Sequence, residues 1–320
     1  MRVWAVSDVH TDYKDNMAWA EQLCSSRETR EDTLIVAGDV SDDLPTFRRT
    51  MELLTRAYAH VFFVPGNHDL WCRKAERDIR DSLGKLALLE GACAELGVYT
   101  QPACVGGVWV VPLLSWYHAS WDREPDLPGA TPIEKVTTIM MDFHACTWSS
   151  VPGLTPADDS IAWHMDSLND PGTARVLAAL DAAEAVSGVR PPLITFSHFL
   201  PDQRLLPEKR MLHHPNLAKA VGSDPLAARI ARLRPAAHVF GHTHFSWDAE
   251  LDGVRYVQWP LGYPAEQRRR GRPAADWRPM LVYDGARGEL TSPRACYWSS
   301  HYAAVRRTPW DLTPAPWVAA

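Results

Sequence analysis

The sequence predicts an α/β fold, because short apolar strands alternate with helical segments through its first half. Two strand-helix units follow each other directly, which favours a parallel sheet covered by helices. A second observation is that several of these strands run straight into Asp, Asn or His. With 320 residues and 46% hydrophobic content, the chain can bury the core of one large domain.

The expected elements of the first half follow in order. The run "RVWAVSD" is a strand, "NMAWAEQLCSS" is helical, and "TLIVAGD" is a second strand. Pro45 suits the first turn of the next helix, and one apolar face recurs at the spacing i, i+4, i+7 and i+11. The third strand is "VFFVPGNHD", and a helix is expected from Arg73 to Leu96. The apolar face consists of Phe47, Met51, Leu54 and Tyr58.

The second half is less regular. After the strand "VGGVWVVP", residues Leu113 to Gly188 mix Pro, Trp and charged residues with weak periodicity, which indicates a large insertion. Strands resume at "PLITFSH", "AHVFGHTH", "VRYVQWP" and "PMLVYD", and the last three are close enough in sequence for antiparallel pairing. We therefore expect one domain over residues 1–320, with an insertion at 113–188 and a C-terminal extension at 265–320.

Composition excludes several classes of protein. A net charge of -6 argues against broad electrostatic binding to nucleic acid or anionic lipid. The six cysteines form no CxxC pair, and no signal peptide precedes the first strand, so we expect reduced thiols in a cytoplasmic protein. No apolar run approaches the roughly 20 residues of a membrane span, so no membrane partner is expected.

Polar residues at the strand ends are the most informative pattern. Because the carboxyl ends of strands line the ligand crevice in open α/β sheets, these side chains should converge. They comprise two carboxylates, one amide and four imidazoles, without a thiolate. The residues are Asp8, His10, Asp39, Asn67, His198, His242 and His244, and a fifth imidazole, His68, follows Asn67 directly.

This donor set suits transition-metal ions such as Mn, Fe, Zn or Co. Seven donors are too many for one ion, but they fit two ions about 3.5–4 Å apart that share a bridging carboxylate. Two divalent ions bring more positive charge than the two carboxylates remove. An acidic protein would thus still present a cationic pocket to an anionic substrate.

The blocks "SDVH", "AGDV", "PGNHD", "FSH" and "FGHTH", in this order, resemble the signature of the calcineurin-like metallophosphoesterases. The resemblance implies a four-layer α/β/β/α sandwich of two mixed sheets. It also implies a metal-dependent phosphoesterase in which a hydroxide shared between two metal ions attacks phosphorus. The ions would be divalent or trivalent Mn, Fe or Zn.

By motif position, the resemblance assigns a role to each residue. Asp39 would bridge the ions, His68 would stay free of metal and protonate the leaving group, and Asp42 would orient His68. The first ion would be held by Asp8, His10, Asp39 and His244, and the second by Asp39, Asn67, His198 and His242.

One departure from the family's motifs narrows the class of substrate that we expect. Protein Ser/Thr phosphatases of this superfamily have an Arg-Gly pair after the G-D block, whereas this chain has "GDVSDDL". We therefore expect a small organic phosphate ester as substrate. The alternatives are a phosphodiesterase for cyclic nucleotides, a nuclease, which the acidic charge disfavours, and a non-catalytic scaffold, which would be expected to have lost ligands.

Substrate contacts are predicted from aromatic and imidazole side chains near the motifs. The Trp-rich insertion would form a cap or lid over the metals, or else only a local mini-core. Asp69 is expected to be a helix N-cap, and the basic run Arg268 to Arg272 either binds a phosphate group or is a solvated loop. The predicted contacts are Trp71, Trp116, His118, His213, His214 and Tyr263.

Overall fold

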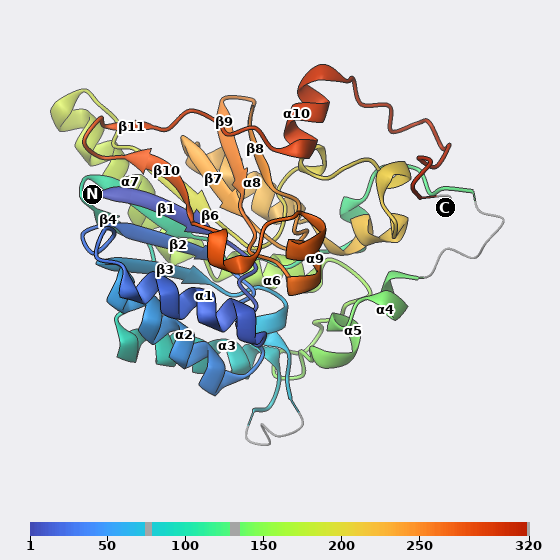
Figure 1. The fold of residues 1–320 in the computed structure, drawn as a ribbon, viewed down its shortest axis with the longest axis horizontal. Coiled ribbons are helices and arrows are strands. Elements are labelled where there is room, and N and C mark those ends of the chain that lie inside the picture. The colour runs from blue at the N-terminus through green and yellow to red at the C-terminus, as the bar shows by residue number, and fades with distance from the viewer. Residues whose placement is uncertain (74–78, 129–134, 319–320) are drawn as a thin grey trace.

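Two mixed β-sheets pack between layers of helices in the computed structural model, which describes residues 1–73, 79–128 and 135–318 (Figure 1). This is the predicted four-layer α/β/β/α sandwich. The first sheet has the order β11-β10-β1-β2-β3, with β1, β2 and β3 parallel and β10 antiparallel to β1. Its strands are β1 (Arg2–Val6), β2 (Thr33–Ala37), β3 (His60–Val64), β10 (Met280–Asp284) and β11 (Glu289–Leu290).

The second sheet has the order β4-β5-β6-β7-β9-β8. Four central strands are parallel, and the edge strands β4 and β8 are antiparallel to their neighbours. Its strands are β4 (Ala103–Val105), β5 (Val108–Pro112), β6 (Leu193–Phe196), β7 (Ala237–Phe240), β8 (Trp247–Leu251) and β9 (Val254–Gln258).

The predicted antiparallel pairing of the last three strands is wrong. β7 and β9 are parallel, because the unpredicted β8 lies between them in sequence and forms a hairpin with β9. The hairpin turn is Asp252-Gly253, and both residues have positive φ, as a tight two-residue turn requires. β10 pairs with β1 in the other sheet, so residues 265–320 are in part integral to the fold.

Three helices cover the outer face of the first sheet: α1 (Lys14–Ser25), α2 (Leu44–Ala57) and α3 (Ser82–Leu96) (Figure 1). The carboxylate of Asp43 caps α2 by accepting from the Thr46 N–H, and the predicted face with Phe47 and Met51 is buried. α3 begins later than expected, capped by Asp81. Residues 74–78 of the predicted helix lie outside the described residues.

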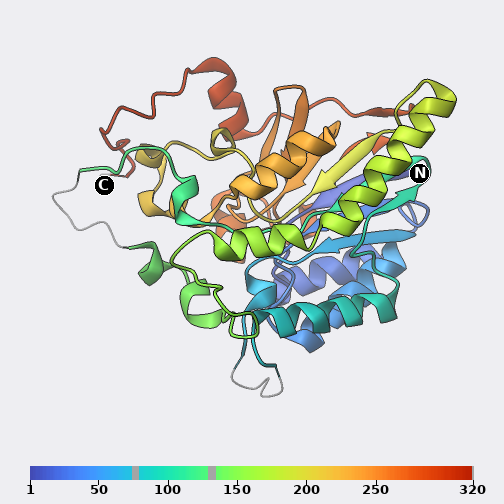
Figure 2. The same ribbon diagram turned by 180° about the vertical axis from the view of Figure 1, so that it is seen from behind.

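Two helices on the other side cover the second sheet: α7 (Asp170–Ser187) and α8 (Asp224–Leu233) (Figure 2). α7 lies in the C-terminal part of the expected insertion. It is an ordinary crossover helix between the parallel strands β5 and β6. Their apolar cluster contains Val111, Leu113, Val176, Leu180, Leu193, Leu226, Ile230 and Leu233.

Where the structure describes the rest of the predicted insertion, its α-helices are short: α4 (Val136–Ile139), α5 (Asp142–Ala145) and α6 (Ser160–Ser167). In both views α4 and α5 project beyond the sheets at the end where the parallel strands finish (Figures 1 and 2). The remaining helices are α9 (Pro264–Arg269) and α10 (Tyr297–Ala304). Across the described ranges, no helix is both long and apolar enough to cross a bilayer.

Candidate metal centre

The seven predicted ligands follow the carboxyl ends of five strands: β1, β2 and β3 of one sheet, and β6 and β7 of the other. Their loops have unusual backbone geometry. Of the seven non-glycine residues with positive φ in the described chain, five are predicted ligands. They are Asp8 (52°), His10 (40°), Asp39 (57°), His242 (78°) and His244 (57°). Strain concentrated at a cluster of polar side chains is typical of a functional site.

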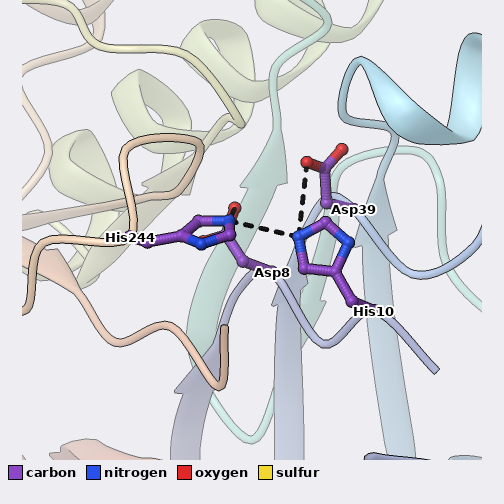
Figure 3. Close-up of side chains that lie close together, drawn as sticks. All are labelled: Asp8, His10, Asp39 and His244. Carbon is purple, nitrogen blue, oxygen red and sulfur yellow. Dashed lines mark hydrogen bonds and ion pairs between the residues drawn. The ribbon is translucent and has the colours of Figure 1, made fainter. Parts of the chain in front are cut away.

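One group of ligand atoms joins β1, β2 and the loop after β7. Figure 3 shows the imidazoles of His10 and His244 turned toward each other, with Asp8 and Asp39 beside them. The two Nε2 atoms are 3.1 Å apart. His244 Nε2 lies 3.5 Å from Asp8 Oδ1, and His10 Nε2 lies 3.9 Å from Asp39 Oδ2. Four side chains thus each offer one ligand atom to the same small volume.

A second group contains Asp39, Asn67, His198 and His242. Asn67 Oδ1 is 3.0 Å from His198 Nε2 and 2.9 Å from His242 Nδ1. Asp39 Oδ2 is 3.4 Å from His198 Nε2. Asp39 therefore belongs to both groups, as a bridging carboxylate would.

Whether these groups fit metal ions depends on the protons of the imidazoles. In three of them, the inner nitrogen faces the other ligand atoms and the outer nitrogen faces away from them. His198 Nδ1 lies 2.9 Å from the Ala37 carbonyl, and His242 Nε2 lies 2.8 Å from the Ala220 carbonyl. His244 Nδ1 is 2.7 Å from a Glu266 carboxylate oxygen. These oxygens only accept, so each outer nitrogen carries a proton, and the inner nitrogen is the one that can bind a cation when it is deprotonated. The residues fit a two-metal centre.

The two imidazoles of each ligand group differ in the direction of their pKa shifts. Burial alone would lower the pKa of His198 and of His244, but nearby carboxylates outweigh it, raising these pKa values to about 9 and about 10. Burial lowers the pKa of His242 to about 3 and that of His10 well below its usual value. Each group therefore pairs one readily protonated imidazole with one that stays neutral.

Metal binding is expected to release about two protons per chain at pH 8, because His198 and His244 are protonated there and must lose a proton to bind a cation. The apparent affinity should rise with pH until about pH 9–10. Calorimetric titration of metal into metal-free protein, in buffers of different protonation enthalpy, gives the number released. Binding without proton release at pH 8 would contradict these ionisation states.

His68 lies beside both groups. Its Nε2 is 3.2 Å from the Tyr263 hydroxyl and 3.9 Å from Asp39 Oδ2. Its ring stacks on Trp71, with ring centroids 3.8 Å apart. The backbone N–H of His68 donates to Asp39 Oδ1, which fixes the loop. The imidazole is thus held by contacts with Tyr263 and Trp71 while its side chain stays 19% exposed.

The structure does not show the predicted contact between Asp42 and His68. The Asp42 carboxylate pairs with the guanidinium of Arg73, a stronger partner than a neutral imidazole, and no described contact joins it to His68. Tyr263 and Trp71 orient His68 instead.

Asp69 is not a helix cap either. It lies inside the short 3₁₀ helix His68–Leu70, and its buried carboxylate accepts from the backbone N–H groups of Asp39, Val40, Ser41 and Gly66. Asp69 thereby ties the loop after β2 to the loop after β3, which brings Asp39 and Asn67 together.

A cavity of about 290 Å³ opens over the two groups. Asp39, Asn67, His68, His242 and His244 form its polar floor. One wall is apolar and comes largely from the insertion. The other lining residues are Trp71, Ile139, Met140, Met141, Asp142, Leu217, Thr243, Tyr263 and Glu266.

Of the predicted substrate contacts, only Trp71 and Tyr263 line this cavity. Trp116 is buried against Trp148 and Phe199, so its predicted contact is wrong. His118 is also buried and bonds to Ser120 and the Asp224 N–H.

The remaining predicted contacts lie elsewhere. His213 and His214 are exposed outside the cavity lining. Two further tryptophans of the insertion differ in burial: Trp121 is buried in a separate cluster, whereas Trp163 is exposed. Trp116 and Trp148 are buried in the main hydrophobic cluster and Trp121 in a second one, and none of the three lines the cavity.

Sequence reasoning missed two residues at the site. Glu266, in the first turn of α9, binds His244, and its only sequence signal was its place three residues after Tyr263, as in a helix capping box. Asp142, at the start of α5, binds Asn67 and Trp71, and nothing in the irregular insertion pointed to it.

Known proteins resemble this chain in sequence and in fold. The family model for calcineurin-like phosphoesterases matches residues 1–131. The [acyl-carrier-protein] phosphodiesterase PptH of Mycobacterium tuberculosis is 30% identical over 281 residues, which is 84% of this chain and 80% of that protein. The crystal structure of phosphopantetheinyl hydrolase (PptH) from the same organism covers 88% of this chain and 95% of its own, with 27% identity and a TM-score of 0.58. The chain therefore belongs to the calcineurin-like phosphoesterases, enzymes that hydrolyse phosphoric esters at a dinuclear metal centre.

Proposed function

We propose that this enzyme is a phosphodiesterase that removes the phosphopantetheinyl group from an acyl carrier protein. The observation that carries the proposal is the 30% identity to PptH over 84% of this chain. The expectation of a free small ester is revised accordingly: the ester itself is small, but a protein carries it. Such a substrate accords with the cytoplasmic location expected from the six unpaired cysteines.

The shape and chemistry of the cavity support this substrate. Its floor is polar, and its apolar wall is formed by Ile139, Met140, Met141 and Leu217. A phosphopantetheinyl arm is long, narrow and partly apolar, with its phosphate at one end. The phosphate would lie on the floor while the arm follows the apolar wall.

Two ions would be held by the two ligand groups, with Asp39 in both. The nitrogen and oxygen donors suit Mn, Fe or Zn. When bound, the ions would neutralise phosphoryl charge and lower the pKa of a bound water. The ligands are Asp8, His10, Asp39 and His244 in one group, and Asp39, Asn67, His198 and His242 in the other.

His68 would hold the proton that the leaving oxygen requires. The residue lines the cavity, and its Nε2 lies within reach of the Tyr263 hydroxyl, which can keep the imidazole in one orientation. Stacking on Trp71 shields one face of the ring from water. The lid expected from residues 113–188 would be limited to the segment around α4 and α5, since α7 covers the sheet.

The proposal is tested by incubating the metal-loaded enzyme with a phosphopantetheinylated acyl carrier protein. We expect mass spectrometry to show loss of the phosphopantetheinyl group from the carrier, and no loss with Asp39→Asn as the control. Parallel assays use a cyclic nucleotide, single-stranded DNA and p-nitrophenyl phosphate. Faster cleavage of any of these than of the carrier protein would overturn the proposal.

A further inference from the structure

The carboxylate of Asp142 is the meeting point of three side chains. Asn67 Nδ2 and Trp71 Nε1 both donate to its Oδ1, at 2.9 and 2.7 Å, and the Tyr117 hydroxyl donates to its Oδ2 at 3.0 Å. Asp142 is only 2% exposed, and no lysine or arginine of the described residues is among the groups that act on its charge. A buried carboxylate is costly unless it is well hydrogen-bonded, so these three donors hold it firmly.

The bond to Asn67 decides which way its amide points. An asparagine amide has a donor end and an acceptor end of similar shape. Because Nδ2 donates to Asp142, Oδ1 must face His198 Nε2 and His242 Nδ1. A flipped amide would turn its oxygen toward the carboxylate and its NH₂ toward the two imidazole nitrogens.

The hydrogen bond to Trp71 links Asp142 to His68, the residue that would protonate the leaving group. The indole N–H is anchored on Asp142, and the same indole stacks on the His68 ring at an interplanar angle of 30°. One carboxylate thus fixes a ligand of one ion and the aromatic support of His68. It comes from α5, in the segment that forms the apolar wall of the cavity.

We propose that Asp142 is a positioning residue that holds the Asn67 oxygen toward the second ligand group and supports His68 through Trp71. This inference deepens the proposed function and rests on it for the ligand role of Asn67. It also means that the insertion completes the metal centre as well as lining the cavity.

The first test compares two substitutions of similar size. Asp142→Leu removes every acceptor, whereas Asp142→Asn keeps a carbonyl that can accept from Asn67 and Trp71, while its NH₂ can donate to the Tyr117 oxygen. We expect Asp142→Leu to weaken binding of one of the two ions on the order of 10–100-fold, and Asp142→Asn to restore most of that loss. His144→Ala, an exposed change on the same short helix, is the matched control and should bind both ions normally.

A second test does not depend on the folding of Asp142→Leu. Asn67→Asp would place a carboxylate against Asp142 and should weaken the same ion, although carboxylates are good ligands. Adding Asp142→Asn supplies a donor to the new carboxylate and should recover the affinity. Wild-type binding by folded Asp142→Leu, or no recovery in the double variant, would overturn the inference.

These readouts separate the inference from the proposed function. Metal affinity is measured calorimetrically without substrate. If the wild-type enzyme left carrier protein uncleaved while Asp142→Leu still lost one ion, the assignment of Asp142 would stand and the proposed substrate would fall.

Discussion

Asp39→Asn is expected to lower metal content and abolish phosphoester hydrolysis together. Asp39 Oδ2 faces His10 and His198, one from each ligand group, while Oδ1 accepts from the His68 N–H. The amide removes the negative charge that both ions would share and turns one acceptor into a donor. We expect metal affinity to fall about 100-fold or more, and kcat/KM on the order of 10³-fold or more.

The measurement combines metal analysis of the purified variant with hydrolysis of a p-nitrophenyl diester. Asp15→Asn, an exposed carboxylate on α1, is the control for charge and should behave as wild type. Two ions per chain with near-normal turnover in Asp39→Asn would remove the bridging assignment.

His68→Ala should have the opposite pattern, with metal content retained and rate reduced. We expect a loss on the order of 10²–10⁴-fold, the range for removal of a general acid. The loss should shrink for p-nitrophenyl esters, because a good leaving group needs less protonation than an alkoxide. The measurement is kcat/KM for an alkyl and a p-nitrophenyl diester, together with metal analysis.

Two variants accompany this test. His213→Ala removes an exposed imidazole outside the cavity and should leave the rate unchanged. Tyr263→Phe removes the hydroxyl that contacts His68 and should give a smaller defect of the same kind. Equal losses for the alkyl and p-nitrophenyl esters in His68→Ala would rule out the acid role.

The ligand groups could be predicted from sequence because each ligand sits in a short local pattern at a strand end. Parallel strands bring their carboxyl ends to one edge, so residues as distant as Asp8 and His244 meet there. Repeated strand-helix units likewise predicted the parallel strands β1, β2 and β3 of the first sheet and the helices that cover them. Local patterns of this kind can be recognised in a sequence without knowledge of distant contacts.

Contacts that depend on distant pairing could not be predicted. Asp142 meets Asn67 across 75 positions from a segment without periodicity, and the Asp42 carboxylate had a competing partner in Arg73. The tryptophans of the insertion have similar sequence surroundings, but they differ in burial. Trp116 is in the core, whereas Trp163 is exposed. Sheet order also escaped prediction, because β10 returns from the far end of the chain to pair with β1.

The left-handed backbone at Asp8, His10, Asp39, His242 and His244 limits which amino acids these positions accept, apart from any role in binding. Aspartate and histidine tolerate positive φ better than most residues, whereas β-branched side chains do not. Glutamate could also bind a metal, but its side chain is longer than that of aspartate. It would also be less favourable than aspartate in a backbone of positive φ. Exchange of ligand types at this site is therefore restricted twice, by coordination chemistry and by chain conformation. A redesign for another metal would have to rebuild the loops before it changed the ligands.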